Sequence, residues 1–357
     1  MKDYIILIPA LNPPKDRLKS YVDDLRARGF EKIILVNDGS DEGYKKYFNK
    51  YKEDGIDVFT HVKNFGKGRA MKNAFNYILA SYDEFSYVIC ADSDGQHRVD
   101  DILKIVKHLE KNKEACLVLG SRDFDRENVP PKSKYGNKLT SLIYYLFFGD
   151  KIRDTQTGLR AIPRSYLKDF LDLDGERFEY EINMLINASK TDKNIKEIPI
   201  ETIYYNDNKE THFRPLMDSF KIYRVIFKTF FKFLISSISS WLVDISMFRI
   251  LFKILAKFIN NYSPIIWIST FVARVISGIF NFVINKNLVF EDASHNRTVR
   301  ARYFSLWLVQ LILSAFLVDN IFKKINMDTS VIKILVDTFI FILSFKIQDK
   351  YIFNRRK

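Results

Sequence analysis

Short apolar runs alternate with amphipathic stretches through roughly the first 120 residues of the chain. The apolar runs read as strands and lie at 4–9, 32–36, 56–61, 87–91 and 115–120. Between them, apolar residues recur at helical spacing over 16–29, 69–81 and 99–111. Strands that alternate with helices favour right-handed parallel units, so we expect an open α/β sheet.

Four of these strands end in polar turns. The turns are Pro9-Ala10-Leu11-Asn12, Asn37-Asp38-Gly39, Asp92-Ser93-Asp94 and Gly120-Ser121-Arg122. Sheets of this kind bind their ligands at the carboxyl ends of the strands. We therefore expect the chemistry of this domain to lie along one edge of the sheet.

Two carboxylates, Asp92 and Asp94, follow the apolar run at 87–91 and are one residue apart. An extended backbone places both on the same side. Two like charges so close repel unless a cation lies between them. Oxygen ligands suit Mg²⁺ or Mn²⁺, ions that commonly bridge to substrate phosphates. A solvated acidic turn is the alternative for so short a motif, and the neighbouring strand ends favour the metal.

Cationic residues near these turns are candidates for binding phosphate. Lys67 lies between Gly66 and Gly68 at the predicted start of a helix. The segment is too short for a Walker A loop, and no G-x-G-x-x-G motif follows the first strand, so a dinucleotide-binding loop has little support. A lysine at a helix start can bind phosphate, the alternative being a turn shaped by the two glycines. Arg122 is placed to meet a phosphate as a two-pronged donor.

A second region, beyond residue 232, contains four longer apolar stretches. They lie at roughly 233–252, 264–285, 303–322 and 331–348. About 20 helical residues cross a hydrocarbon core of ~30 Å, so each is a candidate membrane span. Charged residues inside them should face other helices, water or headgroups, and a cytosolic helical bundle is the alternative.

Two further segments, 136–149 and 213–233, mix basic or polar residues with large apolar ones. This pattern suits helices that lie in the headgroup layer of an anionic membrane, the alternative being ordinary core-facing helices. The chain has 357 residues and a formal charge of +13, which favours polyanionic partners such as anionic lipid or phosphorylated substrates.

The two cysteines, Cys90 and Cys116, lie inside apolar runs and should be buried reduced thiols. The amino-terminal residues lack the basic and then apolar pattern of a leader, so no cleaved signal peptide is expected.

Over residues 1 to about 215, the combination resembles glycosyltransferase family 2 with the GT-A fold. The resemblance rests on IPALN at 8–12, VNDGS at 36–40, NFGKGRAMKNAF at 64–75, ADSDGQH at 91–97, GSR at 120–122 and DTQTGLRA at 154–161. These segments are most similar to the branch that makes polyprenyl-phosphate sugars, the dolichol-phosphate mannose synthases and bactoprenol glucosyltransferases. The resemblance implies a catalytic domain over 1–215, an interfacial amphipathic helix over 216–232 and a membrane domain over 233–357.

The resemblance also implies roles for particular residues. The metal would be held by Asp92, Asp94 and Gln96. The nucleotide sugar would be bound by Pro9, Ala10, Leu11, Asn12, Asp38, Lys67, Asp92 and Arg214. The lipid phosphate would be bound by Arg122, Lys132, Ser133 and Lys134. Catalysis would depend on Asp94, Arg122, Asp154 and Gln156. Arg160 is a further candidate for the same anionic cleft, and Glu181 for binding sugar hydroxyls or orienting the arginines.

The implied acceptor decides the expected mechanism. A phosphate whose second pKa is about 6 is largely ionised at neutral pH, so it needs no strong base to attack. We expect in-line attack on the anomeric carbon with inversion, while the metal and arginines stabilise the departing diphosphate. Asp154 as a true general base stays open. The sugar donor would be of the UDP-glucose or GDP-mannose type.

The second region resembles the GtrA-like family of four-helix membrane proteins. The resemblance rests on SSWLVDISMF at 239–248, NFVINKNLVF at 281–290 and SFKIQDKYIF at 344–353. The last two segments echo each other and indicate a two-plus-two internal repeat. Four crossings, with basic residues in the linker at 286–302 and at the end of the chain, place the catalytic domain and both termini on the cytoplasmic side.

Two other functions are open at this point. One is a transporter of lipid-linked sugar whose soluble half loads it. The other is a processive polysaccharide synthase, although the Q-x-x-R-W run of such enzymes is absent. The expected partners are the nucleotide sugar, a polyprenyl phosphate and the bilayer, without nucleic acid and with a possible homo-oligomer.

Overall fold

The computed structural model describes residues 1–112, 114–124, 131–201, 215–260, 262–290, 297–325 and 329–353. The chain divides into two compact units, Met1–Ile226 and Phe227–Lys357. The boundary falls inside one long helix, α8 (Pro215–Leu255). The helix expected at 216–232 and the apolar stretch expected at 233–252 are therefore continuous. Each unit is described by itself below.

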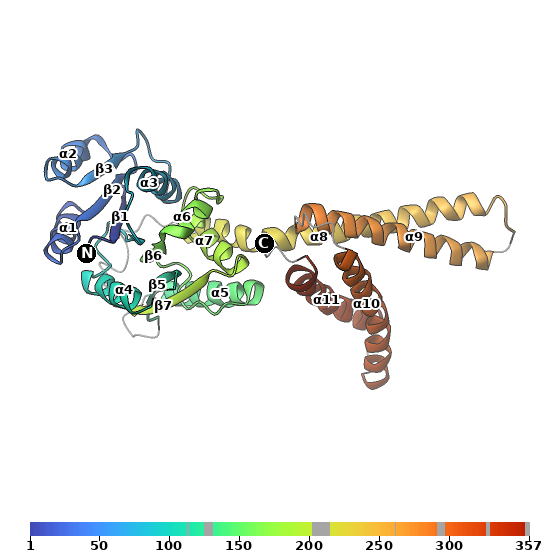
Figure 1. Ribbon diagram of the computed structural model, residues 1–357. Helices are drawn as coiled ribbons and strands as arrows, with labels where there is room; N and C mark the ends of the chain where they lie inside the picture. Colours follow the sequence, from blue (N-terminus) through green and yellow to red (C-terminus); the bar gives the residue numbers. More distant parts are fainter. Residues whose placement is uncertain are drawn as a thin grey trace. The chain divides into compact units, whose positions relative to one another are not determined.

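The first unit is built on a mixed seven-stranded sheet (Figure 1). Its strands are β1 (Tyr4–Ala10), β2 (Lys32–Asn37), β3 (Asp57–Thr60), β4 (Tyr87–Cys90), β5 (Cys116–Arg122), β6 (Arg160–Pro163) and β7 (Asn194–Ile200). They are ordered β3-β2-β1-β4-β6-β5-β7. All neighbouring pairs are parallel except those of β6, which runs antiparallel to both β4 and β5. The expected α/β class is confirmed, and the five strands expected from the sequence, β1 to β5, all run in the same direction; the antiparallel β6 lies beyond the region in which strands were expected.

Helices cover both faces of the sheet. They are α1 (Lys15–Ala27), α2 (Lys45–Glu53), α3 (Lys67–Ser81), α4 (Val99–Lys111), α5 (Pro131–Phe148), α6 (Arg164–Leu171) and α7 (Glu179–Lys190), with a short 3₁₀ turn η1 (Glu42–Tyr44). Side chains of β1 alternate between the two faces, as a pleated strand requires. Ile5 and Leu7 pack with α3, α6 and α7, while Ile6 and Ile8 pack with α1, α2 and α4.

The reversed direction of β6 brings the segment before it to the functional edge of the sheet. β4 and β5 end at this edge, and β6 begins there. Thr157 Oγ1 donates to the carbonyl of Gly120 (2.6 Å), and Gly120 N donates to Leu159 O (2.9 Å). Residues 154–159 are thereby fixed beside the end of β5.

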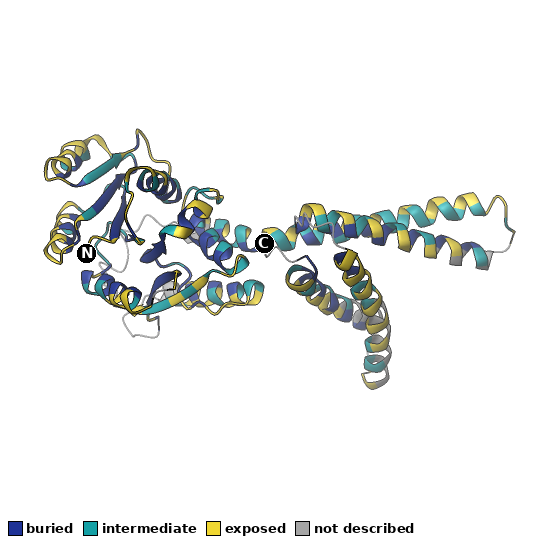
Figure 2. Ribbon diagram, viewed as in Figure 1, coloured by how far each residue is buried: buried dark blue, intermediate teal, exposed yellow. Residues whose placement is uncertain are grey.

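The second unit consists of long helices: the remainder of α8, α9 (Tyr262–Ile284), α10 (Arg297–Lys324) and α11 (Thr329–Ile347). Figure 2 shows largely buried strands in the first unit and many exposed positions on these helices. Large apolar side chains are among them: Trp241 is 59% exposed, Ile235 64% and Phe271 71%. Within the described residues, no helix combines the length and the apolar character needed to cross a bilayer.

The internal repeat expected from the sequence has a structural counterpart. α9 and α11 each end in a π-helical turn, η3 (Asn285–Val289) and η4 (Gln348–Ile352). The first residues of the two turns meet, since Asn285 Nδ2 donates to Gln348 Oε1 (3.0 Å). The phenylalanines that follow them, Phe290 and Phe353, stack with ring centroids 5.0 Å apart.

Each turn also has a cationic partner at the matching carbonyl. Lys232 Nζ donates to Leu288 O (3.1 Å), and Arg302 Nη1 donates to Tyr351 O (3.2 Å). Leu288 and Tyr351 are the fourth residues of their π-turns. A π-turn leaves carbonyls without their usual helical partners, and these side chains satisfy them.

Candidate active site

The turns after β1 and β2 are tied to each other by side chains. Asn12, with a left-handed φ of 45°, donates from its backbone N to Ser40 Oγ (2.9 Å). Its side chain exchanges two hydrogen bonds with Asp41, from Asn12 Nδ2 to Oδ2 and from Asp41 N to Asn12 Oδ1. Pro9 and Ala10 are buried and Leu11 is half-buried. The expected nucleotide-binding loop is thus tied to the turn after β2 by these hydrogen bonds.

Asp38 lies at the end of β2 and is almost fully buried. Its carboxylate accepts hydrogen bonds from the backbone N–H groups of Phe65 (3.0 Å) and Gly66 (2.8 Å) and from His61 Nδ1 (2.7 Å). The other ring nitrogen of His61, Nε2, accepts from Asn73 (2.9 Å). Asp38 therefore anchors the loop that leads into α3 and Lys67.

The sequence did not predict a role for His61 beside Asp38. It comes 23 residues after Asp38, at the end of a different strand, so only the pairing of β2 with β3 brings the two together.

Lys67 lies at the start of α3 and bridges two carboxylates. Its Nζ is 2.6 Å from Asp92 Oδ1 and 2.8 Å from Glu181 Oε1. Burial by itself would lower the pKa of Lys67, but the two carboxylates outweigh it and hold this pKa above its usual value. Burial likewise opposes the charged form of Asp92, but Lys67 and His97 Nε2, which lies 3.1 Å from Oδ2, hold the pKa of Asp92 well below its usual range.

Asp94 is the less compensated of the two carboxylates. Burial raises its pKa, and the charge of Asp92 raises it further. Its Oδ1 accepts from the backbone N of Gln96 (3.0 Å). A cation beside Asp94 would stabilise its ionised form, so the two carboxylates and the Gln96 amide fit an oxygen-ligated divalent ion. In the described part of the chain, no three His, Cys, Asp or Glu side chains gather into a metal-holding cluster.

A glycine leaves room for Asp92. A Cβ placed on Gly158 would lie 2.1 Å from Asp92 Oδ2 and 2.6 Å from its Cγ. Gly158 belongs to the segment that precedes the antiparallel strand β6. This segment therefore shapes the carboxylate site as well as the region around Arg122.

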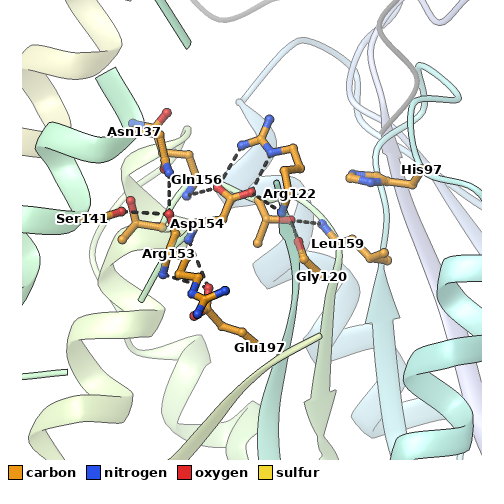
Figure 3. Close-up of polar contacts among 12 residues, drawn as sticks. His97, Gly120, Arg122, Asn137, Ser141, Arg153, Asp154, Gln156, Leu159 and Glu197 are labelled. Carbon is orange, nitrogen blue, oxygen red and sulfur yellow. Dashed lines mark hydrogen bonds and ion pairs between the residues drawn. The ribbon is translucent and has the colours of Figure 1, made fainter. Parts of the chain in front are cut away.

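Arg122 and Asp154 form a two-pronged ion pair, drawn in Figure 3. Arg122 Nε donates to Asp154 Oδ2 (2.6 Å) and Nη2 to Oδ1 (3.0 Å). Asp154 is fully buried and also accepts from the backbone N of Arg122 (3.2 Å) and of Gln156 (3.2 Å). The sequence predicted that both residues belong to the site. In the structure, both carboxylate oxygens of Asp154 accept hydrogen bonds from the Arg122 guanidinium and so orient it.

The other candidate cations have different fates. Arg160 is fully buried, and its Nε, Nη1 and Nη2 donate to the carbonyls of Thr157, Glu181 and Thr155, so its expected place in an anionic cleft is wrong: each guanidinium nitrogen bonds to the backbone of the domain. Lys134 is half-buried in α5. The side chains of Lys132 and Ser133, and the whole of Arg214, lie outside the described residues.

Comparison of the sequence with known proteins shows the family to which the chain belongs. A profile described as glycosyl transferase family 2 matches residues 5–171. The UDP-N-acetylglucosamine–dolichyl-phosphate N-acetylglucosaminyltransferase of Methanococcus voltae is 32% identical over 242 residues, which cover 61% of this chain and 92% of that protein. The chain belongs to glycosyltransferase family 2. It is an enzyme that transfers a sugar, and its α/β unit is the GT-A domain expected for the family.

Other comparisons extend the match. The human dolichyl-phosphate beta-glucosyltransferase is 30% identical to this glycosyltransferase over 227 residues, covering 57% of this chain and 67% of that one. A solved structure, the glucosyl-3-phosphoglycerate synthase of Mycobacterium tuberculosis with Mn²⁺, UDP and glucosyl-3-phosphoglycerate, is 18% identical with a TM-score of 0.47. It covers 63% of this chain and 78% of that one. A profile described as GtrA/DPMS, transmembrane domain, matches residues 225–353, so the expected GtrA-like domain is confirmed.

Proposed function

We propose that this glycosyltransferase moves a hexose from a nucleoside-diphosphate sugar to a polyprenyl phosphate at the cytoplasmic face of a membrane. One observation carries the proposal: Lys67, Asp92 and Asp94 lie at the same sheet edge as the Arg122–Asp154 pair. A diphosphate leaving group and a phosphate acceptor both need positive charge nearby, which Lys67, Arg122 and a cation held by the two carboxylates would supply. Relatives named for dolichyl-phosphate substrates and the GtrA/DPMS domain support a lipid acceptor.

In this proposal a divalent ion, Mg²⁺ or Mn²⁺, would be held by Asp92, Asp94 and Gln96. When bound, it would supply positive charge to the departing diphosphate. Lys67 keeps Asp92 ionised and in place, and Gly158 allows that carboxylate to lie where it does. The loop from Pro9 to Asn12 and the loop anchored by Asp38 would bind the nucleotide, together with Arg214.

Arg122 would orient the acceptor phosphate for in-line attack, with inversion at the anomeric carbon. Lys132, Ser133 and Lys134 would bind the same phosphate. The acceptor oxygen is already ionised near neutral pH, so attack requires no strong base. The ion pair with Asp154 supports this role of Arg122, because both oxygens of Asp154 accept from the guanidinium and hold it in place. Its role is then to hold the arginine, with Gln156 beside it, and not to remove a proton.

The membrane side of the proposal rests on the exposed face of α5 and on the helices of the second unit. α5 exposes an apolar stripe at helical spacing: Tyr135 is 72% exposed, Leu139 51%, Leu142 55% and Leu146 46%. Lys138 beside it is also exposed, which suits an anionic headgroup layer. The transmembrane-domain profile that matches residues 225–353 supports placing the second unit in the bilayer, where its helices would cross four times with both termini cytoplasmic.

The sugar is best sought among UDP-linked hexoses, with glucose first and GDP-mannose as the comparison. The full-length protein in detergent or nanodiscs should be incubated with labelled nucleotide sugars, polyprenyl phosphate and Mn²⁺ or Mg²⁺. One nucleotide sugar should give a mild-acid-labile lipid product. Asp94→Ala should abolish that product while the protein still enters the membrane fraction. Undiminished transfer by Asp94→Ala would overturn the metal assignment, and no lipid product from any sugar would overturn the acceptor.

A further inference from the structure

A half-buried glutamate on the edge strand β7 holds the peptide segment that carries Asp154. Glu197 Oε1 accepts from two consecutive backbone N–H groups, those of Arg153 (2.9 Å) and Asp154 (3.1 Å). Figure 3 shows Glu197 below this segment and Arg122 on its other side. One carboxylate oxygen thus satisfies two neighbouring donors. A charged acceptor makes both bonds stronger than a neutral acceptor would.

The same segment is held from a second direction by α5. Asn137 Nδ2 donates to the carbonyl of Arg153 (2.5 Å), and Ser141 Oγ donates to the same carbonyl (3.1 Å). Asn137 is 3% exposed, and it lies on the face of α5 opposite the apolar stripe. The Arg153–Asp154 peptide is therefore clamped between two elements, with Glu197 at its N–H groups and α5 at its carbonyl.

Asp154, at the end of the clamped peptide, in turn contacts Arg122. Asp154 has no solvent exposure, so its carboxylate has little freedom beyond what its backbone allows. Both of its oxygens accept from the Arg122 guanidinium. A shift of the Arg153–Asp154 backbone would carry the carboxylate with it, and the arginine would follow.

We propose that Glu197, with Asn137 and Ser141 as its counterparts on α5, is a positioning residue that sets the Arg122 guanidinium for the acceptor phosphate. This rests on the proposed function, which assigns Arg122 to the acceptor. Glu197 itself touches no substrate. It acts through the Arg153–Asp154 amides and Asp154, so its loss impairs the acceptor side of the reaction and leaves the nucleotide-sugar side unchanged.

The test compares Glu197→Ala and Glu197→Gln in the full-length enzyme. Glu197→Ala removes the acceptor of both amides. A catalytic group misplaced by about 1 Å can cost on the order of 10²-fold, so we expect kcat/KM for polyprenyl phosphate to fall by about ten- to a hundredfold. The KM for the nucleotide sugar should not change. Glu197→Gln keeps an oxygen that can accept from both amides and should recover most of the loss. Glu53→Ala, which removes an exposed carboxylate at the end of α2, is the control and should behave as wild type.

A double-mutant cycle separates positioning from general damage. Arg122→Lys replaces the two-pronged guanidinium by a single point charge. If Glu197 acts through Arg122, Glu197→Ala should add little to the Arg122→Lys defect. Equal losses in both backgrounds, or a rise in the nucleotide-sugar KM as large as that for the acceptor, would overturn the proposal.

Hydrogen exchange provides a readout that does not depend on which molecule accepts the sugar. The amides of Arg153 and Asp154 should exchange faster in Glu197→Ala than in wild type, and Glu197→Gln should restore their protection. Unchanged exchange in Glu197→Ala would refute the clamp whatever the substrate is. An enzyme that shows the exchange effect but never glycosylates polyprenyl phosphate would instead refute the proposed function and leave the clamp in place.

Discussion

Gly158→Ala is expected to displace Asp92 and thereby to suppress sugar transfer. The added Cβ would lie 2.1 Å from Asp92 Oδ2, whereas ordinary van der Waals contact begins at 3.4 Å. The difference means that the carboxylate must retreat by more than an ångström. Displacing a catalytic group by about 1 Å can cost on the order of 10²-fold in rate, or about 2.7 kcal/mol of transition-state stabilisation.

The atoms that the new methyl meets are those of the carboxylate itself. Asp92 is partly accessible, with 31% of its side chain exposed, so it can move outward without unfolding the domain. That movement would break its 2.6 Å contact with Lys67 Nζ and separate it from Asp94. We therefore expect a folded protein whose metal requirement is altered and whose turnover is low.

The assay measures kcat/KM for transfer to polyprenyl phosphate over a Mn²⁺ titration, alongside thermal unfolding of the same preparation. Gly43→Ala is the matched control, because a Cβ at Gly43 meets nothing within 4 Å. It should leave both measurements unchanged. Wild-type turnover by a correctly folded Gly158→Ala variant would show that Asp92 need not occupy this position, and the metal assignment would fall with it.

Three further outcomes follow from burial and pairing. Lys67→Met leaves Asp92 and Glu181 without their shared cation and should lower the free energy of unfolding by about 3 kcal/mol; adding Glu181→Gln should recover part of this, and thermal denaturation would show whether it does. Gln348→Leu leaves the Asn285 amide without its partner in the helical unit, which should cost about 1–3 kcal/mol in detergent-based unfolding; an unshifted transition would contradict this. Burial raises the pKa of Cys90 to about 12, so at pH 8 only about one thiol in 10⁴ is ionised and alkylation should require denaturant. Rapid labelling of Cys90 in the native protein would contradict its burial.

The local pattern of apolar and polar residues was sufficient to predict most of the helices and strands in the first half of the catalytic domain. Strands β1, β2, β4 and β5 and helices α1, α3 and α4 begin and end within a few residues of the expected positions. Apolar periodicity and turn residues act over a few residues at a time, so they can be read directly from the chain. The polar turns after parallel strands must share one edge, which is why Asp92 and Arg122 could be assigned to one site.

The tertiary structure decided what depends on contacts between distant segments. Nothing in the four residues of β6 specifies their direction, yet that direction brings Asp154 and Gly158 to the active edge. Glu181 reaches Lys67 across 114 positions, and Glu197 reaches the amide of Asp154 across 43. A carboxylate on a helix or an edge strand resembles any other surface charge in the sequence. Its role appears only once strand order and register have placed it against a particular donor, because the energy of such a pair depends on ångström-scale distance and burial and not on spacing along the chain.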